Sequence, residues 1–376
     1  MIYGRPDGTR RFPWAHGSFT LVSRPITRGR VRHLVGLAAH RGLRALGAHS
    51  YLASVRTAHA IEFVRDTPAR AFDAEDGIAS RRLFERLSAE DVNEIEQRIR
   101  ADSDLGARYA AAADEMSRRR LLLAFAAWLG DPLVDQAAGL GAAQPPDGVH
   151  AMARGPLAAA GGLYEADMVV DALASASVDI ESMGAALDFG CSSGRLVRVL
   201  AAAYPEIEWR ACDPNAAAIA WARENLPGIE FFVNDNAPPL ALDQGSLDLI
   251  CAISIWSHFA PPLGLRWFED MHRLLQPGGV LVCTTHGLTS VATYATHGMR
   301  TAEQSREIAD SLYSRGWWYA QEFGPEGDWG VVNPEWGSTF LSAEWMLTQL
   351  CPRWRVLEFA PGRNQDNQDV YVLQRA

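Results

Sequence analysis

Lysine is absent from this chain of 376 residues, so the basic charge at neutral pH comes from arginine. We interpret this absence as a result of genomic base composition and not as a sign of particular chemistry. Cysteine is scarce. Of the five cysteines, four lie in or beside apolar segments that we predict as core strands, namely Cys191, Cys212, Cys251 and Cys283. Such thiols behave as small buried apolar side chains in a reducing compartment, which argues against a disulfide framework.

Long apolar runs are absent as well. No run reaches the roughly 18 residues that a transmembrane helix needs. The first residues carry arginine and proline where a secretory signal would need an apolar core. We therefore expect neither a transmembrane helix nor a secretory signal, and we expect a cytoplasmic protein.

The charge is distributed unevenly. Residues 1–60 hold ten arginines and one aspartate, a formal charge of +9, which leaves −19 for the rest of a chain whose total is −10. Within that segment, apolar residues of 28–47 recur at helical spacing among arginines. We expect this basic helix to dock on the acidic remainder of the chain, with peripheral contact to an anionic membrane as the alternative. Nucleic acid is not an expected partner, because no aromatic side chains interleave with the arginines.

The most informative segment is 186–194, Ala-Leu-Asp-Phe-Gly-Cys-Ser-Ser-Gly. It predicts a short buried strand, a turn punctuated by glycine, and a helix that begins near Arg195. A dinucleotide fingerprint needs Gly-x-Gly-x-x-Gly, but its second and third glycines are replaced here by Ser192 and Arg195. Asp188 would repel a pyrophosphate but suits an ammonium group. The turn therefore favours a cationic ligand and argues against a nicotinamide-dependent oxidoreductase.

Further strand-like segments follow in an order that a doubly wound sheet requires. They are 208–213, 229–233, 247–256 and the apolar end of 274–285. The first ends at Asp213, 19 residues beyond Gly194, where an acid can accept hydrogen bonds from ribose hydroxyls. The near-continuous apolar run of 247–256 is typical of a central parallel strand that is buried on both faces.

Together these segments resemble the class I S-adenosylmethionine-dependent methyltransferases over about residues 160–376. The resemblance implies an α/β fold with a doubly wound, mostly parallel sheet of seven strands, whose antiparallel closing pair matches 354–359 and 369–373. It also implies S-adenosyl-L-methionine as cofactor, S-adenosylhomocysteine as product, and no metal. Residues 1–150 are expected to form a mainly helical region that caps the active site, docks on a partner or builds a homodimer.

The resemblance also assigns roles to single residues. The glycine turn would border the methionine part of the cofactor, Asp188 its ammonium group and Asp213 its ribose. At 234–236 the resemblance implies adenine contacts, and a plain turn is the alternative. The expected cofactor-binding residues are Asp188, Gly190, Ser192, Gly194, Asp213, Pro214, Asp235, Asn236 and Ile253.

Two histidines follow predicted strands at the edge where the methyl group would lie. His258, after the fourth strand, is the first candidate for a general base, and His286, directly after the fifth strand, is the second. A histidine titrates near neutral pH and can accept a hydroxyl proton. The alternative for each is a structural hydrogen bond, and for His286 that interpretation is favoured.

Motifs of other methyltransferase chemistries are missing. Enzymes that methylate amino groups of adenine or glutamine carry Asn/Asp-Pro-Pro-Tyr/Phe after the fourth strand, where this chain has Ile253-Ser-Ile-Trp256. Metal-dependent catechol-type enzymes need acids after the fourth and fifth strands, where this chain has His258 and His286. We therefore predict metal-independent O-methylation. The alternatives are N-methylation of a small molecule and a catalytically idle module that binds the cofactor and a partner.

Acceptor specificity is expected in 286–345, an insert after the fifth strand that is rich in turn residues and tryptophan. Its aromatic and acidic side chains could form a platform for a sugar or an aromatic acceptor. The alternative is that most of these tryptophans pack the insert onto the sheet. By resemblance, the acceptor is a small molecule, a glycan or a glycolipid, as in tailoring enzymes.

Overall fold

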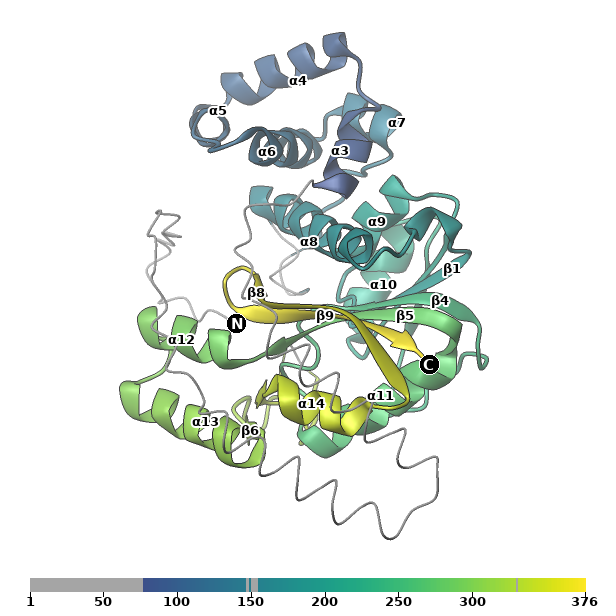
Figure 1. Ribbon diagram of the computed structural model, residues 1–376. Coiled ribbons are helices and arrows are strands. Elements are labelled where there is room, and N and C mark those ends of the chain that lie inside the picture. Colours follow the sequence, from purple (N-terminus) through teal and green to yellow (C-terminus); the bar gives the residue numbers. More distant parts are fainter. Residues whose placement is uncertain (1–76, 147–148, 150–154, 329–330) are drawn as a thin grey trace. The chain divides into compact units, whose positions relative to one another are not determined.

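The computed structural model describes residues 77–146, 149, 155–328 and 331–376 (Figure 1). All of them belong to one compact unit of the chain. The predicted basic helix over 28–47 lies outside the described residues. The boundary proposed between a helical region that ends at residue 150 and a methyltransferase domain that begins at residue 160 stays a prediction.

Five helices precede the long helix α8 (Pro156–Ser175) in the described part of the chain. They are α3 (Ile78–Phe84), α4 (Ala89–Ala101), α5 (Ser103–Ala110), α6 (Glu115–Trp128) and α7 (Pro132–Ala138). Local chemistry sets their ends. Before α4, the Ser88 hydroxyl accepts from the Asp91 amide at 3.1 Å, and the Asp91 carboxylate accepts from the Ser88 amide at 2.8 Å. This reciprocal pair satisfies two amides that the helix itself leaves unpaired.

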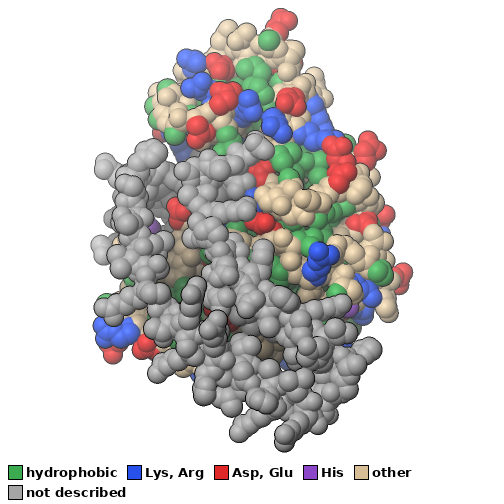
Figure 2. Space-filling model, in the orientation of Figure 1, with side chains coloured by type: hydrophobic (Ala, Val, Ile, Leu, Met, Phe, Trp, Pro, Cys, Tyr) green, Lys and Arg blue, Asp and Glu red, His purple; other side chains and the backbone are tan. Residues whose placement is uncertain are grey.

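The exposed surface of these helices carries charges of both signs. Figure 2 shows acidic and basic side chains mixed at the top of the view, without a large area of one sign. Many of them pair along one helix, as Arg100 does with Glu96 at 2.8 Å and Arg108 with Asp104 at 3.5 Å. Among the described helices, no single one is long and apolar enough to cross a membrane, and α6 and α7 would suffice only as a pair bent by 116°.

Helix α8 (Pro156–Ser175) links these helices to the sheet. Asp167, with no exposed surface, accepts from the Ser80 amide at 2.7 Å and forms an ion pair with Arg120 of α6. One turn later, Asp171 accepts from the amides of Gly77 and Ile78, both at 3.1 Å. The acids four residues apart lie on one face of α8 and cap the N-terminus of α3. On the other side, α8 packs against β5, β8 and β9.

The sheet contains nine strands within the described residues. They are β1 (Ala185–Phe189), β2 (Glu208–Asp213), β3 (Glu230–Val233), β4 (Leu247–Ala252), β5 (Leu275–His286), β6 (Trp317–Ala320), β7 (Ser338–Leu341), β8 (Trp354–Asn364) and β9 (Gln368–Arg375). The first five are parallel, in the order β3-β2-β1-β4-β5, and β9 runs antiparallel between β5 and β8. The seven predicted strands are therefore confirmed.

The two additional strands were not predicted. They form an antiparallel hairpin inside 286–345, and β7 pairs with β5 only at His286 and Phe340. The rest of that insert includes helices α12 (Leu288–Thr296) and α13 (Ala302–Arg315). The insert is therefore a folded extension of the sheet, and its many turn residues lie mainly between elements. Trp318 and Phe340 pack in its own small apolar cluster.

Side chains of alternate strand residues enter two separate cores, as the two-residue period of a strand requires. Ala186, Leu249 and Val282 face the core shared with α8 and α9 (Val197–Ala203). Leu187 and Ile250 face the core shared with α11 (Pro261–Leu274) and α14 (Ala343–Leu350). Figure 1 shows α8, α9 and α10 (Ala216–Asn225) on one side of the sheet and α11 and α14 on the other. All five cysteines are free thiols, as predicted.

We predict that Asp167→Ala lowers the free energy of unfolding by about 3–5 kcal/mol, because the guanidinium of Arg120 stays buried without its partner. Urea denaturation followed by circular dichroism measures the loss. The matched control is Glu85→Ala, whose carboxylate is 68% exposed and lies 4.0 Å from Arg81. That variant should stay within about 0.5 kcal/mol of the unaltered protein. An equal effect of the two substitutions would contradict the role given to the buried pair.

Candidate functional site

The strand order reverses between β1 and β4. Open α/β sheets bind ligands at the carboxyl ends of the strands beside such a reversal. The turn after β1 carries Gly190 and Gly194 at φ values of 82° and 81°. A Cβ atom on Gly190 would lie 2.1 Å from Cδ1 of Ile255, and one on Gly194 would lie 2.6 Å from Cδ1 of Leu226. Both positions therefore favour glycine by backbone conformation, and an added Cβ would also displace the side-chain ends of Ile255 and Leu226.

Ser192, between the two glycines, also adopts a positive φ, of 52°. A side chain in this region is uncommon and costs about 1–2 kcal/mol. The Ser192 amide donates to Asp213 at 2.8 Å, which holds the turn against β2. The hydroxyls of Ser192 and Ser193 are buried without a hydrogen-bond partner among the described residues. Two unpaired hydroxyls in a turn this tight fit a site that a polar ligand completes.

Asp213 sits at the end of β2, where the sequence predicted it. Its two carboxylate oxygens accept from the amides of Ser192 and Asn215, both at 2.8 Å. Each carboxylate oxygen has a second lone pair, so capacity remains for ribose hydroxyls. Burial raises the pKa of Asp213, against the effect of these two amides. Pro214 is half-buried between Asp213 and Asn215, whose side chain caps α10.

Asp188, at 2% exposure, lies under the turn and accepts from the Val197 amide, the first of α9, at 3.2 Å. Burial raises its pKa to about 7, and the neighbouring carboxylate of Glu165 adds to the rise. A cation bound beside this carboxyl group would favour its ionised form and lower its pKa. The position fits the ammonium role expected for Asp188.

The segment expected beside adenine is more open. Asp235 and Asn236 are exposed, and the Asn236 amide group donates to the Val332 carbonyl at 3.1 Å. The end of β3 is therefore tied to the insert. Ile253, directly after β4, is half-buried against the core beneath α8. No observation assigns Asp235, Asn236 or Ile253 to a ligand, so their roles stay predictions.

His258 lies in an aromatic environment that the insert provides. Its ring stacks on Trp336 with centroids 4.7 Å apart, and its Nδ1–H donates to the Gly337 carbonyl at 2.7 Å. Because Nδ1 carries the proton, Nε2 is the acceptor nitrogen of a neutral ring. Burial lowers the pKa of His258 to about 4. His258 is therefore neutral at physiological pH, and the bond to Gly337 also braces the insert.

His286 is 5% exposed and has partners at both nitrogens. Its Nδ1–H donates to the Thr339 carbonyl at 3.2 Å, and Nε2 lies 3.0 Å from the Tyr294 hydroxyl and 3.3 Å from the Gln368 amide nitrogen. Burial, together with the nearby ring of His258, lowers the pKa of His286 to about 3. This arrangement favours the structural alternative for His286, while a catalytic role stays a prediction.

Gln368, the first residue of β9, was not singled out from the sequence. Its Oε1 accepts from the Thr284 hydroxyl at 2.8 Å and from the Asn364 amide at 2.9 Å. Its Nε2 donates to the Ser254 hydroxyl at 2.5 Å and to His286. The amide of Ser254 in turn donates to the Thr284 hydroxyl at 2.7 Å. Gln368 thus fixes the turn after β4 to the ends of β5 and β9.

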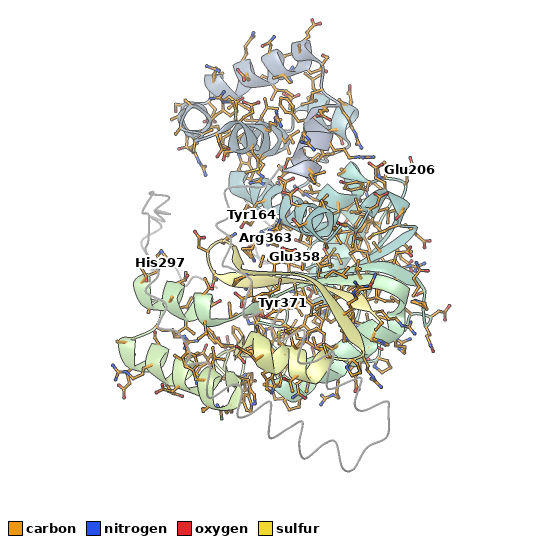
Figure 3. All side chains as sticks on the ribbon, viewed as in Figure 1. Tyr164, Glu206, His297, Glu358, Arg363 and Tyr371 are labelled. Carbon is orange, nitrogen blue, oxygen red and sulfur yellow. The ribbon has the colours of Figure 1, made fainter. Side chains whose placement is uncertain are left out.

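Glu165 of α8 was also missed, because nothing in its neighbourhood along the chain marks it. It is 6% exposed and forms a 2.6 Å ion pair with Arg195, next to the glycine turn. Tyr164 beside it reaches the turn between β8 and β9, where Gln365 donates to its hydroxyl at 2.8 Å. Figure 3 shows Tyr164 next to Arg363 at the end of β8, whose carbonyl accepts from the Tyr164 hydroxyl at 3.3 Å.

Residues 335–336 of the insert lie beside the turn that carries His258. The indole of Trp336 donates to Asp328 at 2.9 Å, and Ala260 donates to the Glu335 carbonyl at 2.8 Å. Burial raises the pKa of Asp328, whose charge acts on Asp213. Within the described part of the chain, no three or more His, Cys, Asp or Glu side chains are grouped to hold a metal ion.

Comparison with known proteins agrees with this geometry. Residues 186–279 match the profile of a family described as a methyltransferase domain. Trans-aconitate 2-methyltransferase of Acidovorax sp. (strain JS42) is 35% identical over 98 residues, which are 25% of this chain and 35% of that protein. The biotin biosynthesis bifunctional protein BioCD of Bordetella avium (strain 197N) is 33% identical over 108 residues, 26% of this chain and 21% of that protein. The chain thus spans about a third or less of these curated relatives.

Solved structures that resemble the chain include methyltransferases. A SAM-dependent methyltransferase from Methanosarcina mazei is 20% identical, with a TM-score of 0.38, and the match covers 52% of this chain and 93% of that one. An S-adenosylmethionine-dependent methyltransferase from Mesorhizobium loti is 16% identical, with a TM-score of 0.34 and coverage of 51% and 91%. The family match lies on the glycine turn and strands β1 to β4 described above. Residues 186–279 are therefore similar to a methyltransferase domain, in agreement with the resemblance of the sequence motifs to S-adenosylmethionine-dependent methyltransferases.

Proposed function

We propose that the protein transfers the methyl group of S-adenosylmethionine to an oxygen atom of a small-molecule, sugar or glycolipid acceptor without a metal ion. The observation that carries the proposal is the glycine turn with Asp188 and Asp213 at the point where the strand order reverses. The unpaired buried hydroxyls, and the carboxyl of Asp188, whose pKa burial raises to about 7, fit a polar, cationic ligand. When bound, this cofactor supplies an electrophilic methyl group on a sulfonium.

The residues of the site would act mainly by positioning. In-line displacement needs the acceptor atom about 3 Å from the methyl carbon, and alignment of this kind contributes much of the rate. Asp213 and the Ser192 amide would orient the ribose side of the cofactor, and Asp188 its ammonium. A hydroxyl acceptor must also lose a proton, and the neutral Nε2 of His258 would accept it. His258 and the Trp336 ring would flank the acceptor.

The proposal that the acceptor atom is an oxygen rests on the residues that follow β4 and β5 at the same edge of the sheet. The turn after β4 holds Ser254 and His258, and β5 ends at His286, so neither the acids of metal-dependent enzymes nor an Asn/Asp-Pro-Pro turn is present there. One of the relatives is named for methylation of trans-aconitate. An acidic small molecule is therefore included among the acceptors to be tested.

The first experiment supplies methyl-labelled S-adenosylmethionine and the purified protein to a host lysate separated into membrane and soluble fractions. Label in a base-stable, lipid-extractable product would support a glycolipid acceptor, and label in a soluble product would support a tailoring role on small molecules. Binding of S-adenosylhomocysteine without any transfer of label would contradict the proposal and favour the idle module.

We predict that Gly190→Ala abolishes measurable binding of S-adenosylhomocysteine, because the new Cβ would meet Ile255 and strain a backbone with φ of 82°. Isothermal titration calorimetry measures the binding. The matched control is Gly228→Ala, at φ of 85° but with nothing within 4 Å of the new Cβ, which should keep the affinity within about threefold. Equal binding by both variants would contradict the close approach assigned to Gly190.

We predict that His258→Asn lowers kcat by about 10²–10⁴, while the cofactor Kd changes less than threefold. The asparagine amide can still donate to the Gly337 carbonyl, so it keeps the bracing bond but has no nitrogen in place of Nε2. His258→Ala loses both. If His258→Asn transferred methyl groups at the rate of the unaltered protein, the general-base role would be excluded.

A pH profile provides an independent check on His258. Burial lowers its pKa to about 4, so the ring is protonated, and cannot accept a proton, only below that pH. We therefore expect kcat at saturating cofactor to show no histidine limb between pH 8 and 5.5. A loss of kcat centred near pH 6.5, the ordinary value for histidine, would contradict the buried environment of this ring.

A further inference from the structure

Helix α8 packs so closely against the end of the glycine turn (residues 190–195, called the cofactor turn below) that only glycine fits at their contact. A Cβ atom on Gly162 would lie 2.6 Å from the Arg195 carbonyl oxygen, so the two backbones are nearly in contact. One turn further along α8, the Glu165 carboxylate pairs with the guanidinium of Arg195 at 2.6 Å. Arg195 is thus held at its carbonyl and at its side chain by a single helix. Glu165 reaches the cofactor turn from outside the strands that carry the family motif.

The charges around this turn do not balance. Asp188 is faced by Glu165 from α8, Asp213 from β2 and Arg195 from the turn itself. Three thiols also face it, and burial raises the pKa of each well above its usual value, so they are neutral: Cys191, Cys212 and Cys251. Among the described residues, three carboxyls therefore share one cation. A buried site of this kind favours a ligand that brings positive charge.

The methyl donor and its product differ in this respect. S-adenosylmethionine carries a sulfonium in addition to its ammonium and carboxylate, so its net charge is about +1 at neutral pH, whereas the sulfur of S-adenosylhomocysteine is uncharged. Every other group is shared by the two molecules. A negative charge near the sulfur therefore strengthens binding of the donor and has little effect on the product. Such a difference would help the product to leave.

We propose that Glu165 is a positioning residue that completes the cofactor site from α8 and makes the site prefer the cationic donor over its uncharged product. The inference rests on the proposed function, because it assumes that S-adenosylmethionine binds at this turn. Glu165 holds Arg195 in place and contributes a negative charge beside Asp188. Neither contribution can be read from the glycine motif.

The test measures the Kd of both ligands by isothermal titration calorimetry at pH 8, for the full chain and for Glu165→Gln. We expect the ratio of the product Kd to the donor Kd to fall about fivefold in Glu165→Gln, because one negative charge beside Asp188 is removed while the shape of the side chain is kept. Glu165→Asp keeps the charge and should keep the ratio, with weaker binding of both ligands. Circular dichroism checks that each variant is folded.

The matched control is Asp171→Asn on the same helix. Asp171 caps α3, away from the cofactor turn, so any effect on the helix should weaken both ligands equally and leave the ratio unchanged. An unchanged ratio in Glu165→Gln would mean that Glu165 only braces α8, which overturns the inference. Failure of the unaltered protein to bind either ligand would instead contradict the proposed function itself.

A second readout uses pH and needs no substitution. As the pH falls through about 7, Asp188 takes up a proton and the site loses negative charge. Because Asp188 is expected beside the ammonium that both ligands carry, the Kd of both should rise between pH 8 and 6, and binding of either should release protons. Kd values that stay constant across this range would contradict a site whose negative charge binds the cationic part of its ligand.

Discussion

Two consecutive amides of the glycine turn, those of Gly190 and Cys191, donate to one carbonyl at the end of β2, that of Cys212, at 2.9 and 3.0 Å. Asp213, the next residue of β2, accepts from the Ser192 amide. These three bonds join the turn after β1 to the adjacent parallel strand. Because both glycines and Ser192 have positive φ, the turn is held in a conformation that it would not keep alone. The cofactor site depends on this attachment.

The turn is then enclosed from two further directions. On one side, Ile255 of the turn after β4 fills the space where a side chain of Gly190 would lie. On the other, α8 brings Gly162 and Glu165 against Arg195. The first contact comes from within the sheet and the second from a helix that also caps α3 through Asp167 and Asp171. Helix α8 therefore connects the helices that precede the sheet to the glycine turn.

Much of the fold could be predicted because it depends on neighbouring residues. Apolar segments and their order along the chain identified the strands, and the seven predicted segments match observed strands. The capping pair that begins α4 is local in the same way, because Ser88 and Asp91 are three residues apart. The glycine turn was found for the same reason, since Asp188, Gly190 and Gly194 lie within seven residues.

The remainder of the site depends on contacts that sequence spacing does not encode. Gln368 and Ser254 are separated by 114 positions, and His258 and Gly337 by 79. Glu165 meets Arg195 across 30 positions, at a distance along the chain set by a helix, a connection and a strand. The hairpin of β6 and β7 was missed because each strand has only four residues and pairs mainly with the other.

The ring of hydrogen bonds around Gln368 has a direction. The Thr284 oxygen accepts from the Ser254 amide, so its hydroxyl hydrogen is free to donate to Oε1 of Gln368, whose Nε2 then donates to the Ser254 hydroxyl. Rotating the amide of Gln368 by half a turn would place its oxygen against the acceptor Nε2 of His286 and its nitrogen against the donor Nδ2 of Asn364. His286 and Asn364 thus fix the orientation of the Gln368 amide, and that amide supplies a hydrogen-bond partner to the hydroxyls of both Ser254 and Thr284. During evolution, Ser254, Thr284 and Gln368 should therefore be retained or replaced together, as one inherited unit.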